Sequence, residues 1–181
     1  NNMKYNDIDL QNYTGTTFDV YKDQEGVTIM KFSSGEWLKN EEQYANLFLG
    51  KCDACASFFK DSFKDFAFDS VLIAGLGFGL IPQELSEVNK CSKIDVVEIN
   101  QEIIDYNISS GHLNSSINII KGDIFEHTTT EKYDLIIIDT IWQEAEMPEV
   151  KYQELVSRFY NTNLNKEGAL YTPVLRKWLI K

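Results

Sequence analysis

Residues 71–80, which read VLIAGLGFGL, limit the possible folds of this chain more than any other segment. The apolar run before the glycines predicts a buried parallel strand. Gly75, Gly77 and Gly79 stand at alternate positions after it, where glycine lets the backbone turn sharply and approach a ligand. Pro82 follows just inside an expected helix, whose first N–H groups favour an electron-rich ligand. The segment predicts a strand, a ligand-binding turn and a helix in succession.

A second apolar strand follows at 94–97 and runs into Glu98. An acid placed about twenty residues after a glycine-rich turn is where ribose-binding carboxylates occur in α/β nucleotide-binding folds. Together, the turn and the acid predict a nucleoside-containing cofactor.

Apolar strands and helical patterns alternate through the rest of the chain. Strands are expected at 71–75, 94–98, 117–121, 134–139 and 168–172, and helices at about 79–89, 100–110 and 149–161. This alternation predicts an α/β, Rossmann-like, doubly wound and mostly parallel sheet. Gly111 is expected to end the second helix.

The first forty residues have a different pattern. Two strands are expected at 18–21 and 27–32, joined by a turn at 23–26 that ends in glycine. We therefore divide the chain into an N-terminal β-hairpin extension, residues 1–40, and a single compact Rossmann-like domain, residues 41–181.

Charge and hydropathy narrow the range of partners. The formal net charge of −11 disfavours nucleic acid and suits a small cation or a neutral metabolite, although acidity alone also keeps a protein soluble. No apolar run reaches the roughly 18 residues of a membrane helix, and the first residues lack a signal-peptide pattern. No membrane association and a cytoplasmic location are expected.

The cysteines do not indicate a metal centre. Cys52 and Cys55 have the spacing of half a zinc site, but no second pair exists, and His112 and His127 are distant in the sequence. No metal is therefore predicted, and burial of the two thiols on a helix face is the alternative.

Ligands of open parallel sheets bind beyond the carboxyl ends of the strands, so the residues there are the candidate site. Glu98 is suited to two ribose hydroxyls, and Asp123 to an exocyclic adenine amine. Ile99 and Ile124 are placed to enclose an adenine ring, and Asp139 is expected near the reacting centre. Any one of these acids could instead cap a helix or be a solvated charge.

These segments resemble the class I S-adenosylmethionine-dependent methyltransferases and, within them, the spermidine synthase-like group. Residues 71–79, 97–99, 122–126 and 133–139 resemble four motifs of that superfamily. The resemblance implies S-adenosylmethionine, or its decarboxylated form, as cofactor. It implies these cofactor-binding residues: Gly75, Gly77, Phe78, Gly79, Glu98, Ile99, Asp123, Ile124 and Asp139.

Upstream, residues 40–44 resemble the Asp-Glu-Phe-x-Tyr segment of aminopropyltransferases, which places Tyr44 on the substrate side. The resemblance implies that Asp139 and Tyr44 are catalytic. Two departures matter: Phe78 stands where aminopropyltransferases carry an acid, and residues 139–143 read DTIWQ where they carry Asp-Ser-Ser-Asp-Pro. The second aspartate, which helps hold the diamine, is lost.

Several functions remain open on the sequence. Methyl transfer to a small amine-bearing acceptor is preferred because the diamine acid is missing. The hairpin and the negative charge instead favour aminopropyl transfer to a polyamine precursor. A non-catalytic nucleoside-binding module is a further alternative, whereas the Gly-x-Gly-x-Gly spacing disfavours a nicotinamide cofactor. The final strands of the fold are expected to be missing, which would leave an apolar sheet edge and predicts a homodimer.

Overall fold

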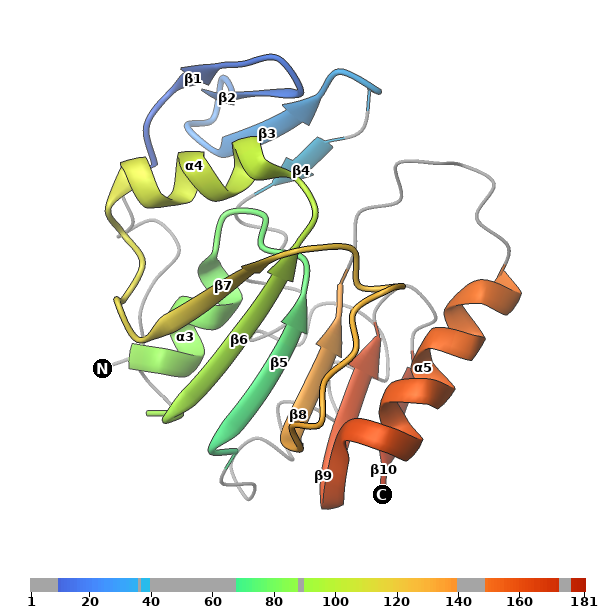
Figure 1. The fold of residues 1–181 in the computed structure, drawn as a ribbon. Helices are drawn as coiled ribbons and strands as arrows, with labels where there is room; N and C mark the ends of the chain where they lie inside the picture. The colour runs from blue at the N-terminus through green and yellow to red at the C-terminus, as the bar shows by residue number, and fades with distance from the viewer. Residues whose placement is uncertain (1–9, 36, 40–67, 88–89, 140–148, 173–176) are drawn as a thin grey trace.

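A computed structural model describes residues 10–35, 37–39, 68–87, 90–139, 149–172 and 177–181. Its larger sheet has six strands in the order β10-β9-β8-β5-β6-β7 (Figure 1). Five of these strands are parallel: β5 (Ser70–Ala74), β6 (Lys93–Glu98), β7 (Ile117–Lys121), β8 (Tyr133–Ile138) and β9 (Leu164–Thr172). The predicted mostly parallel α/β sheet is confirmed, with each predicted strand present.

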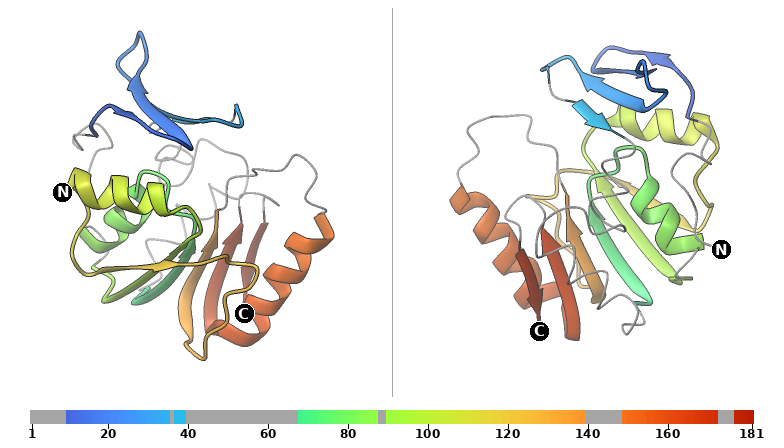
Figure 2. Two further views of the ribbon diagram at one scale, coloured as in Figure 1. Left: turned by 45° about the horizontal axis from the view of Figure 1, so that its top comes forward. Right: turned by 180° about the vertical axis from the view of Figure 1, so that it is seen from behind.

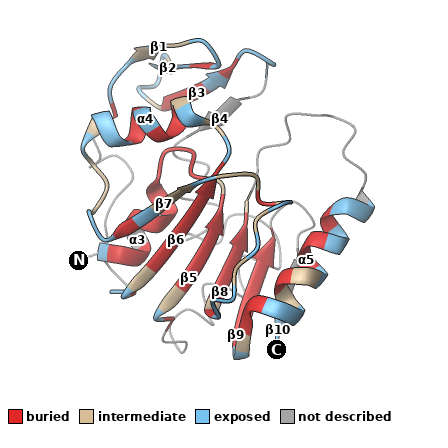
Figure 3. Cartoon of the chain, in the orientation of Figure 1, coloured by how far each residue is buried: buried red, intermediate tan, exposed pale blue. Residues whose placement is uncertain are grey.

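Helices cover both faces of this sheet, as a doubly wound fold requires (Figure 2). The helices are α3 (Leu80–Glu87), α4 (Gln101–Ser110) and α5 (Glu149–Asn163). Successive side chains of a strand point to opposite faces. Val71 and Ile73 thus join the core cluster that includes residues of α3 and α4, whereas Leu72 and Ala74 join the cluster that includes residues of α5. Strands β5, β6 and β8 are buried along most of their length, which explains their continuous apolar runs (Figure 3).

The predicted hairpin is part of a second, antiparallel sheet of four strands. It consists of β1 (Tyr13–Thr14), β2 (Phe18–Lys22), β3 (Thr28–Phe32) and β4 (Trp37–Lys39). Phe18 lies 5.9 Å from Tyr106 of α4, ring centre to ring centre, and 6.0 Å from Phe32. These rings belong to the same core cluster as α3 and α4, so the N-terminal sheet packs directly on the larger domain.

Strand β10 (Lys177–Ile180) was not predicted. It pairs antiparallel with β9, from Lys177 opposite Thr172 to Ile180 opposite Ala169. The edge of β9 is therefore hydrogen-bonded, and β10 is the terminal strand on this side of the sheet. The homodimer stays a prediction. Among the described residues, no helix has the length and apolar character needed to span a membrane.

Candidate active site

Hydrogen bonds beyond the ends of the strands bring the predicted site residues to one edge of the sheet. The Gly75 N–H donates to the carbonyl of Val97 (2.9 Å), and the Asp139 N–H donates to the carbonyl of Ala74 (3.0 Å). The Gly122 N–H likewise donates to the carbonyl of Glu98 (3.0 Å). The glycine turn and three strand-end acids therefore occupy the carboxyl edge together, where ligands of such sheets bind.

Glu98 lies between the glycine turn and the start of α4. Its Oε1 accepts a hydrogen bond from the Leu76 N–H and its Oε2 accepts one from the Asn100 N–H, both at 2.9 Å. The two oxygens of a carboxylate together accept about four hydrogen bonds, so Glu98 retains acceptor capacity for a ligand hydroxyl. Neither Leu76 nor Asn100 was a sequence candidate, because an N–H donor carries no signal in the side-chain pattern.

Burial raises the pKa of Glu98 above the ordinary glutamate value, although the N–H groups of Asn100 and Leu76 oppose this shift. The side chain is only 7% exposed. The ionised carboxylate is therefore incompletely compensated by the protein itself, and further donors from a ligand would stabilise it.

The backbone of the glycine turn has positive φ angles, a conformation that residues with a side chain rarely adopt. Gly75, Gly77 and Gly79 have φ angles of 99°, 54° and 71°. A Cβ on Gly79 would lie 2.5 Å from Leu113 Cδ2, so this position excludes a side chain by space as well as by conformation.

Two polar side chains hold the carbonyls of this turn. Asn107 Nδ2 donates to the carbonyl of Gly77 (2.8 Å), and His112 Nε2 lies 2.7 Å from the carbonyl of Phe78. A carbonyl can only accept, so Nε2 of His112 carries the hydrogen. Burial lowers the pKa of His112, which favours the neutral imidazole with its hydrogen on Nε2. Both residues come from α4 and the loop after it, and neither was predicted.

Two of the predicted cofactor-binding residues are buried. The Phe78 side chain is fully buried in the hydrophobic core, so only its main chain faces the turn. Ile124 is 5% exposed and packs in the α5 core cluster, and its contact with an adenine ring stays a prediction. Ile99 is 54% exposed and remains available. Apolar residues beside acids were indistinguishable on sequence, because burial depends on the partners that the fold supplies.

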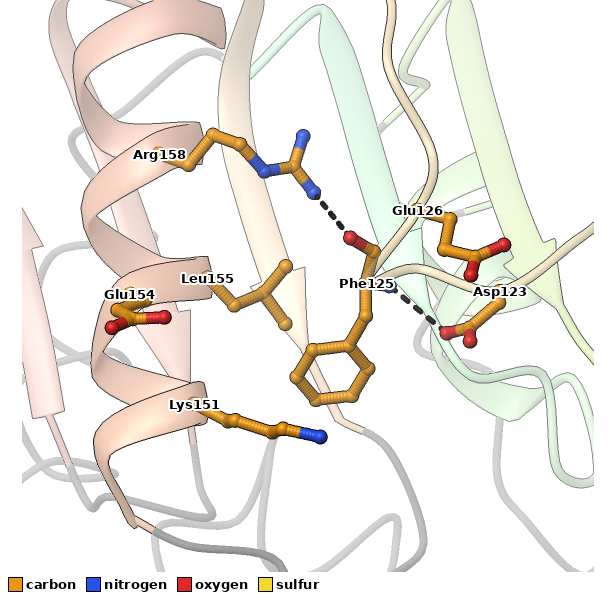
Figure 4. A pocket seen from close by; sticks show the side chains of 7 residues that line it. All are labelled: Asp123, Phe125, Glu126, Lys151, Glu154, Leu155 and Arg158. Carbon is orange, nitrogen blue, oxygen red and sulfur yellow. Dashed lines mark hydrogen bonds between the residues drawn. The ribbon is translucent and has the colours of Figure 1, made fainter.

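Asp123 borders an open pocket of about 450 Å³ between the β7–β8 connection and α5 (Figure 4). This volume lies in the range of small-molecule sites. Asp123 Oδ1 accepts a hydrogen bond from the Phe125 N–H (3.0 Å), so the carboxylate is held at the start of the β7–β8 connection. The pocket is lined by Asp123, Phe125, Glu126, Lys151, Glu154, Leu155 and Arg158.

Arg158 ties this loop to α5. Its guanidinium donates to the carbonyl of His127 (2.8 Å) and to that of Ile124 (3.1 Å) (Figure 4 shows the side chain). Arginine presents several donors in a rigid fork, which suits it to hold successive carbonyls. Arg158 thereby fixes the segment that carries Asp123, a role that helical periodicity could not reveal.

Asp139 follows β8 directly and is partly exposed at the same edge. Tyr44, the predicted substrate-side tyrosine, lies outside the described residues, as do Cys52 and Cys55. Among the residues that the structure does describe, no three histidine, cysteine or acidic side chains are grouped as a metal site would require.

Solved structures of methyltransferases share this fold. N-methyltransferase NodS from Bradyrhizobium japonicum WM9 superposes with a TM-score of 0.53 and 19% identity, over 65% of this chain and 64% of that one. Its complex with S-adenosyl-L-homocysteine superposes with a TM-score of 0.53 and 16% identity, over 71% of this chain and 63% of that one. An S-adenosylmethionine-dependent methyltransferase from Clostridium acetobutylicum ATCC 824 superposes with a TM-score of 0.52 and 17% identity, over 73% of this chain and 55% of that one.

The chain thus spans less than two thirds of the length of each of these structures. At these identities the likeness concerns the fold alone, which the chain shares with these methyltransferases. No family model and no curated protein sequence matches the chain.

Proposed function

We propose that this protein is an S-adenosylmethionine-dependent transferase that transfers a methyl group to a small amine-bearing acceptor. The observation that carries the proposal is the placement of Glu98: a buried carboxylate with unused acceptor capacity, hydrogen-bonded to the glycine turn, at the carboxyl edge of the sheet. The fold shared with S-adenosylmethionine-dependent methyltransferases supports the same assignment.

The residues present fit an adenosyl group. Glu98 would accept hydrogen bonds from the ribose hydroxyls, and Asp123 would accept one from the adenine amine beside the pocket of Figure 4. Ile99 would cover one face of the ring. The glycine turn would let the main chain approach the ligand closely, with its carbonyls already held by Asn107 and His112.

The cofactor supplies an electrophilic carbon bonded to a sulfonium, and the protein must bring a nucleophile into line with it. Asp139 would orient an acceptor amine and accept its proton, because its carboxylate follows β8 next to the glycine turn. A carboxylate at this place would also attract a cationic acceptor. Tyr44 is proposed to assist on the acceptor side.

Aminopropyl transfer from decarboxylated S-adenosylmethionine is the second candidate. The observation that favours it is the N-terminal antiparallel sheet packed on α4, together with the resemblance of residues 40–44 to the aminopropyltransferase segment. Under either function, we propose that the protein forms a homodimer and is located in the cytoplasm.

Calorimetric titration with S-adenosylmethionine and, in parallel, with its decarboxylated form tests the two candidates. Preferential binding of S-adenosylmethionine supports methyl transfer, and preference for the decarboxylated form supports aminopropyl transfer. Adenosine serves as a control for the nucleoside part alone. Binding of none of these ligands would overturn the proposal.

A further inference from the structure

The N-terminal sheet is hydrogen-bonded to the first turn of α4, close to Glu98. The Thr17 N–H donates to Glu102 Oε1 (3.0 Å), and the Thr16 N–H lies 3.3 Å from Oε2 of the same carboxylate. The chain passes so close here that a Cβ on Gly15 would lie 2.4 Å from Glu102 Oε1. Burial tends to raise the pKa of Glu102, but these donors outweigh it and the pKa is lowered, so Glu102 is held as an ion.

The Thr17 hydroxyl links two residues of that turn. It accepts a hydrogen bond from Asn100 Nδ2 (3.0 Å) and donates one to Glu102 Oε1 (3.2 Å). A hydroxyl has one donor hydrogen and can accept, so both of these bonds form at once. The side chain of Asn100 is therefore held by the connection between β1 and β2 of the N-terminal sheet.

Asn100 in turn holds Glu98. It is the N-cap of α4, with φ −93° and ψ 107°, and its Oδ1 accepts from the Glu102 N–H (2.9 Å). Its own N–H donates to Glu98 Oε2 (2.9 Å). The cap fixes the backbone of Asn100, and the backbone of Asn100 fixes one oxygen of the carboxylate.

We propose that the N-terminal sheet positions the cofactor-binding acid: Thr17, acting through Asn100, holds Glu98 in the orientation that receives a ribose. Thr17 is thus a positioning residue that touches no cofactor atom. This inference rests on the proposed function. It assigns the N-terminal sheet a role in cofactor affinity in addition to packing on α4.

Thr17→Val tests the proposal, because it removes the hydroxyl and keeps the β-branched shape and the backbone N–H. The dissociation constant for S-adenosyl-L-homocysteine, measured by calorimetry on the full chain, is expected to rise about three- to tenfold, the range for the neutral hydrogen bond to Asn100. The hydroxyl's bond to Glu102 is lost as well, but the Thr17 N–H still donates to the same oxygen. Thr17→Ser keeps the hydroxyl and should restore the wild-type value.

Thr16→Val is the matched control. Thr16 is an exposed neighbour whose hydroxyl makes no hydrogen bond to any residue that the structure describes, while its N–H is unchanged by the substitution. It should leave the dissociation constant within about twofold. Melting temperatures of all variants without ligand show whether the effect is one of folding.

A double-mutant cycle with Glu98→Gln separates positioning from general destabilisation. If Thr17 acts through Glu98, Thr17→Val has little further effect on affinity in the Glu98→Gln protein. Equal weakening in both backgrounds, or equal affinities of Thr17→Val and Thr16→Val, would overturn this inference while leaving the proposed function standing. Absence of binding to the wild-type chain would instead overturn the proposed function.

Discussion

At the amino-terminal edge of the larger sheet, Asp134 accepts hydrogen bonds from the N–H groups of Asp69 (3.0 Å) and Ser70 (3.2 Å). It also accepts one from Asn165 Nδ2 (2.8 Å). Burial raises its pKa, but these donors outweigh burial and the pKa is lowered. At the carboxyl edge, burial raises the pKa of Glu98 and prevails over the N–H groups of Asn100, Leu76 and Ile99 and the charge of Lys121.

The difference separates a structural acid from a candidate functional one. Asp134 joins β5, β8 and β9 where they begin, and its ionised form is satisfied by the protein. Ionised Glu98 is less well satisfied, so a ligand that brings hydroxyl donors gains from binding there. The two edges of one sheet thus use carboxylates in opposite ways.

The largest effect that tests this division is expected for Asp139→Asn. An asparagine keeps the shape but cannot accept the proton of an amine, so turnover should fall about a hundredfold or more. Release of S-adenosyl-L-homocysteine, with the best acceptor from a panel of monoamines and diamines, measures it. Affinity for S-adenosylmethionine should stay within a few-fold; equal losses of affinity and turnover would make Asp139 a binding residue. Asp105→Asn, on the exposed surface of α4, is the control.

Glu98→Ala should act on affinity. It removes acceptors for ribose hydroxyls, and each charge-assisted hydrogen bond contributes about 1.5–3 kcal/mol, so one such bond corresponds to roughly a ten- to hundredfold rise in the dissociation constant. Calorimetry with S-adenosyl-L-homocysteine measures it. The free energy of unfolding should fall as well, because the N–H groups of Leu76 and Asn100 lose their acceptor, so the affinity is measured on the folded protein. Unchanged affinity would show that the pocket lies elsewhere.

Asp134→Ala should act on stability alone. It removes the acceptor of the half-buried Ser70 and Asn165 donors and of the exposed Asp69 N–H, at a cost of about 1–3 kcal/mol in the free energy of unfolding, measured with urea. The affinity of the folded protein for S-adenosyl-L-homocysteine should stay within about twofold, since the two edges are separated by the length of the strands. A large loss of affinity without loss of stability would contradict the division between the edges.

Much of this arrangement was predictable from sequence, because buried parallel strands are continuous apolar runs that end in glycines or acids. Strand β7 was predicted at its observed bounds, and Gly111 ends α4 in the left-handed conformation with φ 67°. The short strands β1 and β4 were missed, since two or three residues show no periodicity.

The side-chain partners were not predictable. The donors to Glu98, the carbonyl contacts of Arg158 and the link from Thr17 to Asn100 join residues of different elements. Such contacts depend on how distant segments meet, which no local pattern encodes. For the same reason the sequence did not show that Phe78 and Ile124, both predicted ligand contacts, are buried in the fold.

The smallest expected effects concern the pH dependence of stability, to which Glu98 and Asp134 should contribute with opposite signs. The raised pKa of Glu98 means that its folded-state contribution to stability is complete below the unfolded glutamate value of about 4.3 and is lost as pH rises through the folded value. The lowered pKa of Asp134 gives a contribution that is complete above about 3.9, the unfolded aspartate value, and is lost as pH falls through the folded value.

Urea unfolding from pH 3 to pH 7 separates the two contributions. Relative to the wild type, Glu98→Gln should gain stability as pH rises above roughly 4.3, whereas Asp134→Asn should lose its disadvantage as pH falls below roughly 3.9. As pH falls toward roughly 4.3, wild-type affinity for S-adenosyl-L-homocysteine should decrease, because a protonated Glu98 accepts hydrogen bonds less well. The affinity of Glu98→Gln should show no such decrease. Parallel pH profiles for the two proteins would mean that Glu98 does not hold the ligand in its ionised form.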